Sequence, residues 1–414
     1  MHTLITHCRI CKNTNLESIV ELGEQCLTGV FPATKEEHIP KGPLSLVKCI
    51  GDDKSCGLVQ LQHSYDSSEM YGDNYGYRSG LNVSMVDHLH GIVKKAQEFV
   101  TLKPGDLIID IGSNDATLLN SYPDNGYDRV GIDPTAEKFR EFYKKDINVI
   151  PDFFSSANIK KYHPTKKASI ITSIAMFYDL EDPIQFAKEI TDVLADDGIW
   201  VFEQSYILLM LQTHAYDTIC HEHIEYYSLK QIKWILDAVG LKIIDIETND
   251  TNGGSFRVTA AKQSHPHQEA EKAISDYLEN EKKAKLDTMD GYQEFKDAIF
   301  KHREELTALV KRLCAEGKKI FAYGASTKGN VILQYCGFTP AEIPYVAEVN
   351  EYKFGRFTPG THLPIISEKE AKALKPDYLL VLPWHFKKNI LKRETDYINS
   401  GGHLIFPLPQ IEII

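Results

Sequence analysis

One part of the sequence alternates apolar strands with helices, and this alternation constrains the fold more than any other feature. The apolar run Leu107–Ile111 ends in a glycine-containing turn, and similar runs follow at 130–133, 169–174 and 199–203. A helical pattern at 183–194 separates the last two. Parallel strands linked by helices form a sheet that is covered on both faces, and ligands bind at the carboxyl ends of its strands. The sequence therefore predicts a doubly wound α/β domain with a ligand site along that edge.

The turn after the first strand distinguishes between nucleotide ligands. A dinucleotide site needs three glycines, two of which make room for the pyrophosphate and for helix packing. Only Gly112 is present here, with Asn114 and Asp115 where further glycines would fall. The turn therefore disfavours NAD as the cofactor. Two alternatives stay open: an NAD site, and a sheet that binds no cofactor. A strand ending in Asp110, a single-glycine turn and Asp133 after the next strand resemble the class I S-adenosylmethionine methyltransferases.

That resemblance implies a Rossmann-like methyltransferase core with S-adenosylmethionine as its cofactor. It implies that Asp133 holds the ribose hydroxyls and that the turn around Gly112 receives the amino-acid part of the cofactor. Asp152 and Phe153 would flank the adenine. The implied cofactor-binding residues are Asp110, Gly112, Asn114, Asp133, Asp152 and Phe153.

Five of the eight cysteines lie within the first 56 residues. Cys8 and Cys11 have the two-residue spacing that lets one turn present both sulfurs to a tetrahedral metal, and Cys49 and Cys56 form a looser pair. We expect these four thiolates to bind a structural Zn²⁺, with Cys26 as a spare buried thiol; unconnected core cysteines are the alternative. A zinc ion closed by four thiolates has no open position, so it would stabilise a small module and take no part in chemistry.

The stretch 220–228 concentrates titratable groups. Its nine residues include two imidazoles, two carboxylates, two phenols, a thiol and a hydroxyl. Because it follows the strand at 199–203, it should lie at the carboxyl edge of the sheet, where a methyl donor would point. A polar surface corner is one alternative. Another is a metal held by His221 and His223, which an extended segment would place on one face.

A second strand, turn and helix begin near residue 319. The apolar strand at 319–323 runs into a glycine-bearing turn whose amides, with Ser326 and Lys328, would form an anion site at a helix start. The spacing of a P-loop is absent, and an ordinary turn is the alternative. Further strands at 345–350 and 378–384 predict a second α/β domain.

The segment 71–80 mixes glycines with tyrosines, which predicts an ordered loop. It is either a linker between domains or a lid that carries Tyr75 or Tyr77 over a site, supplying an aromatic ring with one hydroxyl.

Taken together, these motifs resemble the deoxysugar C-methyltransferases that act on nucleotide-linked 4-ketosugars. The resemblance covers nearly the full chain and rests on the thiolate module, Ile-Gly-Ser-Asn-Asp at 111–115, His-Glu-His-x-x-Tyr-Tyr-Ser at 221–228 and Tyr-Gly-Ala-Ser-Thr-Lys-Gly-Asn at 323–330. The expected domains are a zinc-binding module at 1–70, a methyltransferase domain at 80–262 and a C-terminal Rossmann-like α/β domain at 263–414 that binds the sugar nucleotide.

The same resemblance implies that Glu222 and His223 are catalytic and that Tyr75 and Tyr77 close over the site. The expected substrate-binding residues, which would grip the diphosphate, are Gly324, Ser326, Lys328, Asn330 and Arg356. A sugar carbon becomes nucleophilic only when a neighbouring ketone acidifies its hydrogen. We therefore expect His223 to remove the proton and Glu222 to orient or polarise His223. A tyrosine hydroxyl should stabilise the enolate.

Two positions depart from the pattern of that family. Cys220 stands where relatives often have a tyrosine, and the segment 173–178 lacks a histidine that relatives tend to carry after the fourth core strand. Tyr178 is expected to take over part of that role. An O- or N-methyltransferase, or a cofactor-binding relative without catalysis, remains an alternative function.

Charge and hydropathy limit the partners. The net charge is −12, and no cluster of Lys and Arg is interleaved with aromatic residues, which argues against nucleic acid. No apolar run approaches the roughly 18 residues of a membrane span, and residues 1–8 lack the pattern of a signal peptide. We expect a cytoplasmic monomer or weak homodimer.

Overall fold

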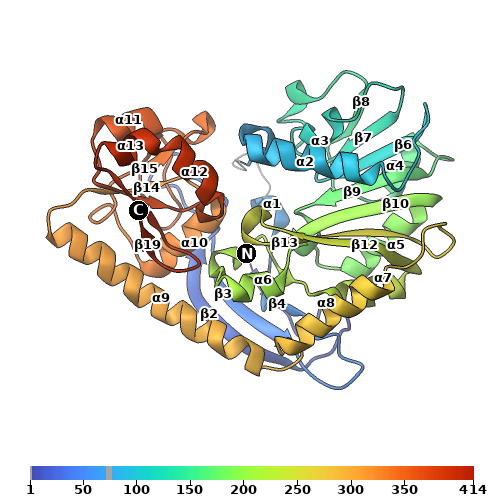
Figure 1. Cartoon of the computed structure of the whole chain (residues 1–414), viewed down its shortest axis with the longest axis horizontal. Helices are drawn as coiled ribbons and strands as arrows, with labels where there is room; N and C mark the ends of the chain where they lie inside the picture. Colours follow the sequence, from blue (N-terminus) through green and yellow to red (C-terminus); the bar gives the residue numbers. More distant parts are fainter. Residues whose placement is uncertain (1, 71–76) are drawn as a thin grey trace.

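The protein contains an N-terminal sheet, a central sheet and a C-terminal sheet, and one strand of the first comes from the middle of the chain (Figure 1). The structure is a computed structural model that describes residues 2–70 and 77–414. The N-terminal strands are β2 (Leu16–Cys26), β3 (Lys41–Cys49), β4 (Val59–Leu61) and β11 (Glu225–Tyr226), in the order β11-β4-β3-β2 and all antiparallel. Beside them, β1 (His2–Leu4) pairs with β5 (His63–Tyr65), and α1 (Ser67–Met70) follows. The predicted reaction stretch thus supplies a strand to the N-terminal module.

The central sheet has seven strands in the order β12-β13-β10-β9-β6-β7-β8. Their bounds are β6 (Leu107–Ile111), β7 (Asp128–Ile132), β8 (Ile147–Ile150), β9 (Ala168–Ile174), β10 (Leu194–Ser205), β12 (Leu241–Asn249) and β13 (Ser255–Lys262). The strands from β10 to β8 are parallel, whereas β13 is antiparallel to both of its neighbours. The chain winds outward from β6 to β8 and then returns to β9, so the switch point lies between β6 and β9, where ligands of such sheets bind. The predicted doubly wound fold is confirmed.

Six α-helices belong to the described part of the central domain. They are α2 (Val83–Ala96), α3 (Thr117–Asn120), α4 (Ser156–Tyr162), α5 (Pro183–Val193), α6 (Ile207–Gln212) and α7 (Leu229–Ala238). In α5, Pro183 occupies the first turn and the side chain of Asp182 accepts from the amide of Gln185, which satisfies one of the free amides at the helix start. In the described part of the chain, no helix combines the length and apolarity that crossing a membrane requires.

The C-terminal sheet has six strands in the order β16-β15-β14-β17-β18-β19, and only β19 is antiparallel. The strands are β14 (Ile320–Tyr323), β15 (Val346–Glu348), β16 (Ile365–Ser367), β17 (Tyr378–Val381), β18 (His403–Phe406) and β19 (Glu412–Ile413). The helices are α10 (Thr327–Cys336), α11 (Glu368–Ala373), α12 (Lys387–Arg393) and α13 (Thr395–Asn399). This arrangement confirms the second α/β domain.

Two helices connect the larger domains. After α8 (Glu271–Lys283), the long α9 (Asp290–Ala315) runs along one side of the molecule toward the C-terminal sheet (Figure 1). Its buried residues, among them Phe295, Ile299 and His302, recur every three or four positions, so a single apolar stripe faces the protein along its length.

The N-terminal module also contacts the C-terminal domain directly. The side chain of Gln334 on α10 accepts from the amide of Cys26 at 2.8 Å and donates to its carbonyl at 3.2 Å. One helical turn earlier, Asn330 donates to the carbonyl of Thr28 at 2.7 Å. The N-terminal module lies between the two larger sheets (Figure 1), and side chains of α10 fasten it through hydrogen bonds to its backbone.

Candidate active site

The four predicted zinc ligands come together. The ligand atoms of Cys8, Cys11, Cys49 and Cys56 all lie within 4.8 Å of one another, and Cys11 alone is only partly buried. The Sγ atoms of Cys8 and Cys56 are 3.4 Å apart, and those of Cys11 and Cys49 are 3.5 Å apart. Four clustered thiols that form no disulfide fit the tetrahedral sulfur set of a structural zinc ion. Cys26 is buried elsewhere, at the end of β2.

Arg9, between the first two cysteines, connects the thiol cluster to the rest of the site. Its side chain is only 3% exposed. The guanidinium donates to the carbonyl of Leu61 at 2.8 Å and to that of His63 at 3.2 Å. It also pairs at 3.0 Å with Glu181, in the segment between η3 (Phe177–Asp179) and α5. In turn the amide of Leu61 donates to the carbonyl of Ile224, so the metal module holds the reaction stretch through β4.

At the carboxyl edge of the central sheet, the predicted cofactor residues surround one turn. Gly112 has φ +71°, and a Cβ there would lie 3.2 Å from Met176, so both backbone and space favour glycine. The amide of Asn114 donates to one oxygen of Asp133 at 2.9 Å. The other oxygen accepts from the amide and hydroxyl of Thr135, both at 2.6 Å. The carboxylate that would hold the ribose is therefore fixed in place.

Asp110 lies deeper in the same edge. It accepts from the hydroxyl of Thr172 at 2.6 Å. Burial raises the pKa of Asp110 to about 7, although the hydrogen bond from Thr172 opposes this.

Asp152 and Phe153 follow β8, next to Asp133. The amide of Asp133 donates to the carbonyl of Ile150 at 3.1 Å, which brings the two strand ends together. The carboxylate of Asp152 accepts from the amide of Phe153 and from Asn158. The Phe153 ring is 52% exposed, so an adenine could cover its open face.

The segment 77–80 lies against the turn that is predicted to bind the cofactor. The side chain of Asn114 donates to the carbonyl of Tyr77 and accepts from the amide of Ser79, and the amide of Gly80 donates to Asp115. Tyr77 itself is 47% exposed. Tyr75 lies outside the described residues.

His223 is oriented by its own loop. Its Nδ1 lies 3.0 Å from the carbonyl of Thr218; because a carbonyl only accepts, Nδ1 carries the proton and Nε2 keeps a lone pair. The Tyr178 ring meets the imidazole edge to face, with 4.3 Å between ring centroids. Burial and the positive charge of Lys328 lower the pKa of His223 to about 3. The imidazole is neutral and can accept a proton at Nε2.

Glu222 lies against the N-terminal module. It is 9% exposed, and a Cβ at Gly29 would lie 2.1 Å from its Oε1 and 3.6 Å from the hydroxyl of Thr327. A glycine is therefore required at 29 for the carboxylate to approach. Burial raises the pKa of Glu222 to about 7, and the positive charge of Lys353 opposes this rise.

Three other side chains of the stretch 220–228 form hydrogen bonds within the protein. His221 is hydrogen-bonded through Nε2 to the carbonyl of Gly42 at 3.3 Å. The Tyr227 hydroxyl donates to Glu225, and the Tyr226 hydroxyl donates to the carbonyl of Thr218. His221 and His223 thus bind different carbonyls, and the possible metal ligands near His223 are Cys220 and Glu222 instead.

Two lysines meet at the start of α10: Lys328 belongs to its first turn, and Lys353 comes from η6 (Glu351–Lys353). Gly324 has φ +84°, and the Ser326 hydroxyl caps the helix by accepting from the amide of Gly329. Lys328 donates to the carbonyl of Asn252, and Lys353 donates to the carbonyl of Ala325, each at 2.7 Å. Helix amides and two cations together favour a bound anion.

Two predicted substrate residues have other contacts here. Asn330 is fully buried and donates to Thr28, and Arg356 donates to the carbonyl of Phe31 at 2.9 Å. Both side chains fasten the N-terminal module to the C-terminal domain. Their role toward a substrate stays a prediction.

Sequence reasoning did not select Lys353 or the contact between Asp217 and Trp384. Lys353 lies in the same short run as Arg356, so the sequence offered two cations and no means to choose between them. The indole of Trp384 donates to buried Asp217 at 2.8 Å and joins η4 (Tyr216–Thr218) to η7 (Trp384–Phe386). No local pattern links positions so far apart in the chain.

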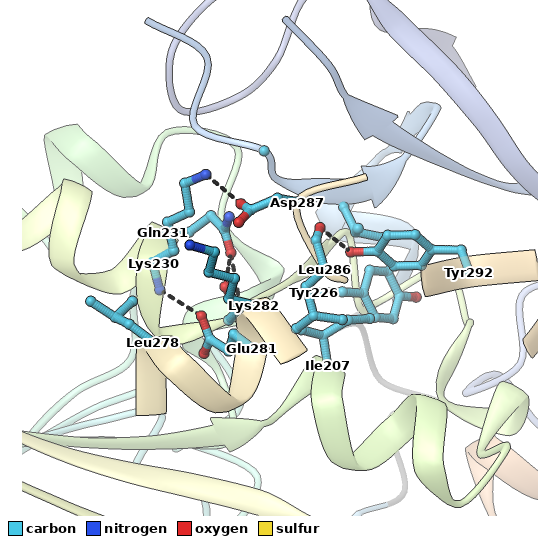
Figure 2. A pocket seen from close by; sticks show the side chains of 13 residues that line it. Ile207, Tyr226, Lys230, Gln231, Leu278, Glu281, Lys282, Leu286, Asp287 and Tyr292 are labelled. Carbon is cyan, nitrogen blue, oxygen red and sulfur yellow. Dashed lines mark hydrogen bonds and ion pairs between the residues drawn. The ribbon is translucent and has the colours of Figure 1, made fainter. Parts of the chain in front are cut away.

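Figure 2 shows a separate cavity of about 290 Å³ between α7, α8 and α9. Tyr226 and Tyr292 line it, together with Glu281, whose carboxylate accepts from the amides of Leu229 and Lys230 at the start of α7. None of the predicted catalytic residues is among those that line it. Its polar groups serve the fold by capping α7.

Three family models match the chain in order. "Putative zinc binding domain" matches residues 8–71, "Methyltransferase domain" matches 87–246, and "C-methyltransferase C-terminal domain" matches 250–409. The C-methyltransferase NovU of Streptomyces niveus is 29% identical over 414 residues, covering 99% of this chain and 97% of NovU. These matches agree with the thiol cluster and the sheet topology, and they confirm both predicted cofactors, S-adenosylmethionine and structural zinc.

Solved structures are less similar. The plantazolicin methyltransferase BpumL in complex with SAH is 13% identical, with 42% of this chain and 82% of BpumL covered and a TM-score of 0.34. The YcgJ protein from Bacillus subtilis is 14% identical, with 42% and 98% covered and a TM-score of 0.34. Neither likeness bears on the substrate.

Replacing Arg9 should loosen the link between the metal module and the reaction stretch. Arg9→Met removes the guanidinium that donates to the carbonyls of Leu61 and His63, so the free energy of unfolding should fall by about 1–3 kcal/mol. Urea denaturation of the zinc-loaded protein measures this. Glu181→Gln is the matched control; because Glu181 is half exposed, its loss should cost less than about 1 kcal/mol. Equal losses in the two variants would contradict the role of the carbonyl contacts.

Asp133→Asn should weaken cofactor binding. Losing a charged acceptor for the ribose hydroxyls should raise the Kd of S-adenosylhomocysteine about 10- to 100-fold, as isothermal titration can measure. Asp128→Asn, at the opposite end of the same strand β7, should bind like the parent. An unchanged Kd in Asp133→Asn would place the ribose elsewhere.

The buried carboxyl of Asp110 should make stability depend on pH. Its pKa of about 7 in the folded protein lies above the unfolded value of about 4, so its contribution is full below about pH 4 and is lost as the pH rises through about 7. When the pH rises from about 5 to about 8, the free energy of unfolding of the parent should therefore fall. The fall should be smaller in Asp110→Asn, by about 2 kcal/mol. Denaturation curves at both pH values test this, and identical pH dependence in the two proteins would rule it out.

Proposed function

Because this chain belongs to the C-methyltransferases that carry an N-terminal zinc-binding module, we propose that its substrate is a nucleotide-linked 4-keto-deoxysugar. The methyl group is transferred to the carbon next to the ketone, after a base has generated the enolate. One observation carries this proposal: the anion-binding start of α10 lies against Glu222 and His223. A nucleotide-linked ketosugar has a diphosphate, which would bind at the start of α10, and an acidic carbon nearby, which would lie at Glu222 and His223.

The proximity of the two parts rests on one close approach and two electrostatic interactions. Gly29 adjoins both the Glu222 carboxylate and the Thr327 hydroxyl of the first turn of α10. The charge of Lys328 acts on His223, and the charge of Lys353 acts on Glu222. The two lysines that would bind the diphosphate therefore also influence the pKa values of the two residues proposed for proton transfer.

His223 is the proposed base because its Nε2 keeps a lone pair and its ring is fixed by Thr218. Bound S-adenosylmethionine supplies an electrophilic methyl group, and the residues around Gly112 and Asp133 would hold it. Glu222 is proposed to orient the base. A diphosphate beside Lys328 would offset that cation and so make the imidazole more basic, which ties proton removal to the presence of substrate.

The enolate needs a donor for its oxygen. Tyr178, whose ring packs on the His223 ring, and Tyr77, whose carbonyl accepts from Asn114 in the cofactor turn, are the tyrosines that we propose for this role. A lost enolate donor costs about 10²- to 10³-fold in rate. Gly324, Ser326 and Lys328 are proposed to bind the diphosphate, with Lys353 as an added cation.

His223→Asn should abolish carbon chemistry and spare the cofactor. In deuterated buffer with S-adenosylhomocysteine, the parent should wash deuterium into the carbon next to the ketone of an accepted nucleoside-diphosphate 4-ketosugar. The variant should do so at least about 100-fold more slowly, because a positioned base contributes about 10²- to 10⁴-fold. Proton NMR follows the exchange.

The matched control is His221→Asn, two residues away, which alters a contact to Gly42 and should retain exchange and turnover. Exchange that survives in His223→Asn, or a large loss of S-adenosylhomocysteine affinity in that variant, would overturn the assignment of the base. Methylation without any exchange in the parent would favour an O- or N-methyltransferase.

A further inference from the structure

A second cluster of metal-binding side chains lies within the reaction stretch. One ligand atom each of Cys220, Glu222 and His223 lies within 4.8 Å of the others. Cys220 is fully buried and Glu222 is 9% exposed. A thiol, a carboxylate and an imidazole are the donors that zinc prefers. Three protein ligands leave a fourth position open, unlike the closed set of four thiols at the N-terminus.

The backbone holds this cluster in place. The amide of His223 donates to the carbonyl of Cys220 at 3.1 Å, which closes a tight turn between two of the ligands. The Nδ1 of His223 is engaged by Thr218, as the second nitrogen of a metal-binding histidine commonly is. Nε2 is then the nitrogen that can bind a metal. Gly29 leaves room for the third ligand, the carboxylate of Glu222.

Charge makes this a weaker site than the four-thiol cluster. A thiolate and a carboxylate would neutralise a divalent cation, but Lys328 acts on Cys220 and His223, and Lys353 acts on Glu222. These positive charges oppose a metal. Soft sulfur and imidazole ligands still select zinc or cadmium over magnesium. The balance favours reversible binding of a soft metal.

We propose that Cys220, Glu222 and His223 bind a second zinc-class ion reversibly, and that the bound ion blocks methylation. On binding, the thiol releases its proton to solvent and the sulfur, one carboxylate oxygen and Nε2 coordinate the metal. The lone pair of Nε2 is then engaged and cannot accept a proton. The metal site stands on geometry alone, whereas the blocking effect rests on the proposed function of His223.

Metal binding is tested by counting ions. Protein that carries one zinc per chain is titrated with Zn²⁺ against a chromophoric chelator. The parent should take up a second equivalent, and Cys220→Ser should not, because a hydroxyl is a poor zinc ligand. Cys220→Ala is a second variant in case serine disturbs the buried position. Cys336→Ser, a buried thiol on α10 outside the cluster, should still bind two, and Mg²⁺ should not compete.

A parent that binds only one zinc, or a Cys220→Ser protein that still binds two, would overturn the site. In the activity assay, the second zinc should slow the parent at least about 100-fold, the contribution of a positioned base, and chelation should restore the rate. The rate of Cys220→Ser should not respond to zinc. Faster turnover with the second ion would refute the block.

The two proposals fail separately. If the parent binds two zinc ions but shows no exchange or turnover with any nucleoside-diphosphate 4-ketosugar after chelation, the proposed function is wrong and the metal site remains. If the parent is active and binds one zinc at every concentration, the second site is wrong and the function remains.

Discussion

The pairing of β11 with β4 is the interaction on which the site depends. β11 has only two residues, Glu225 and Tyr226, opposite Gln60 and Val59. So short a strand has little stability of its own. Its position is fixed because β4 belongs to a module tied by four thiolates and by Arg9, which donates to the carbonyl of Leu61. A zinc ion that takes no part in the chemistry thereby sets where Glu222 and His223 lie.

The site is assembled from all three parts of the chain. Gly29 of the N-terminal module, Glu222 of the central part and Thr327 of the C-terminal domain lie side by side. Lys328 reaches back to the carbonyl of Asn252, in the segment between the central strands β12 and β13. Since each part supplies one of these groups, their relative positions depend on how the domains pack, and the contacts of α10 with the N-terminal module help to position the proposed catalytic residues.

Burial is the physical basis of both roles proposed for the reaction stretch, proton removal and binding of a soft metal. Excluding water lowers the pKa of His223 to about 3 and raises the pKa of Glu222 to about 7, because a low dielectric disfavours the charged form of each group. A neutral imidazole with a lone pair on Nε2 suits the proposed base, and together with Cys220 and Glu222 it also suits a soft metal. The same compact turn holds the proposed base and the proposed metal ligands. The positive charges of Lys328 and Lys353 favour a bound anion there and therefore weaken the binding of a metal cation.

The sequence by itself determined the features that have a local signature. Alternating apolar runs gave the parallel sheet, the spacing of Cys8 and Cys11 pointed to zinc, and the single Gly112 turn pointed away from a dinucleotide. These patterns are readable because periodicity, spacing and glycine conformation act over a few residues.

Only the tertiary structure decided which residues face one another. It paired the reaction stretch with β4, turned His221 toward Gly42 and away from His223, and brought Lys353 to Glu222. It also gave Asn330 a partner, Thr28, some three hundred positions earlier in the chain. Such contacts depend on how separate elements pack, and no short-range pattern in the sequence encodes them.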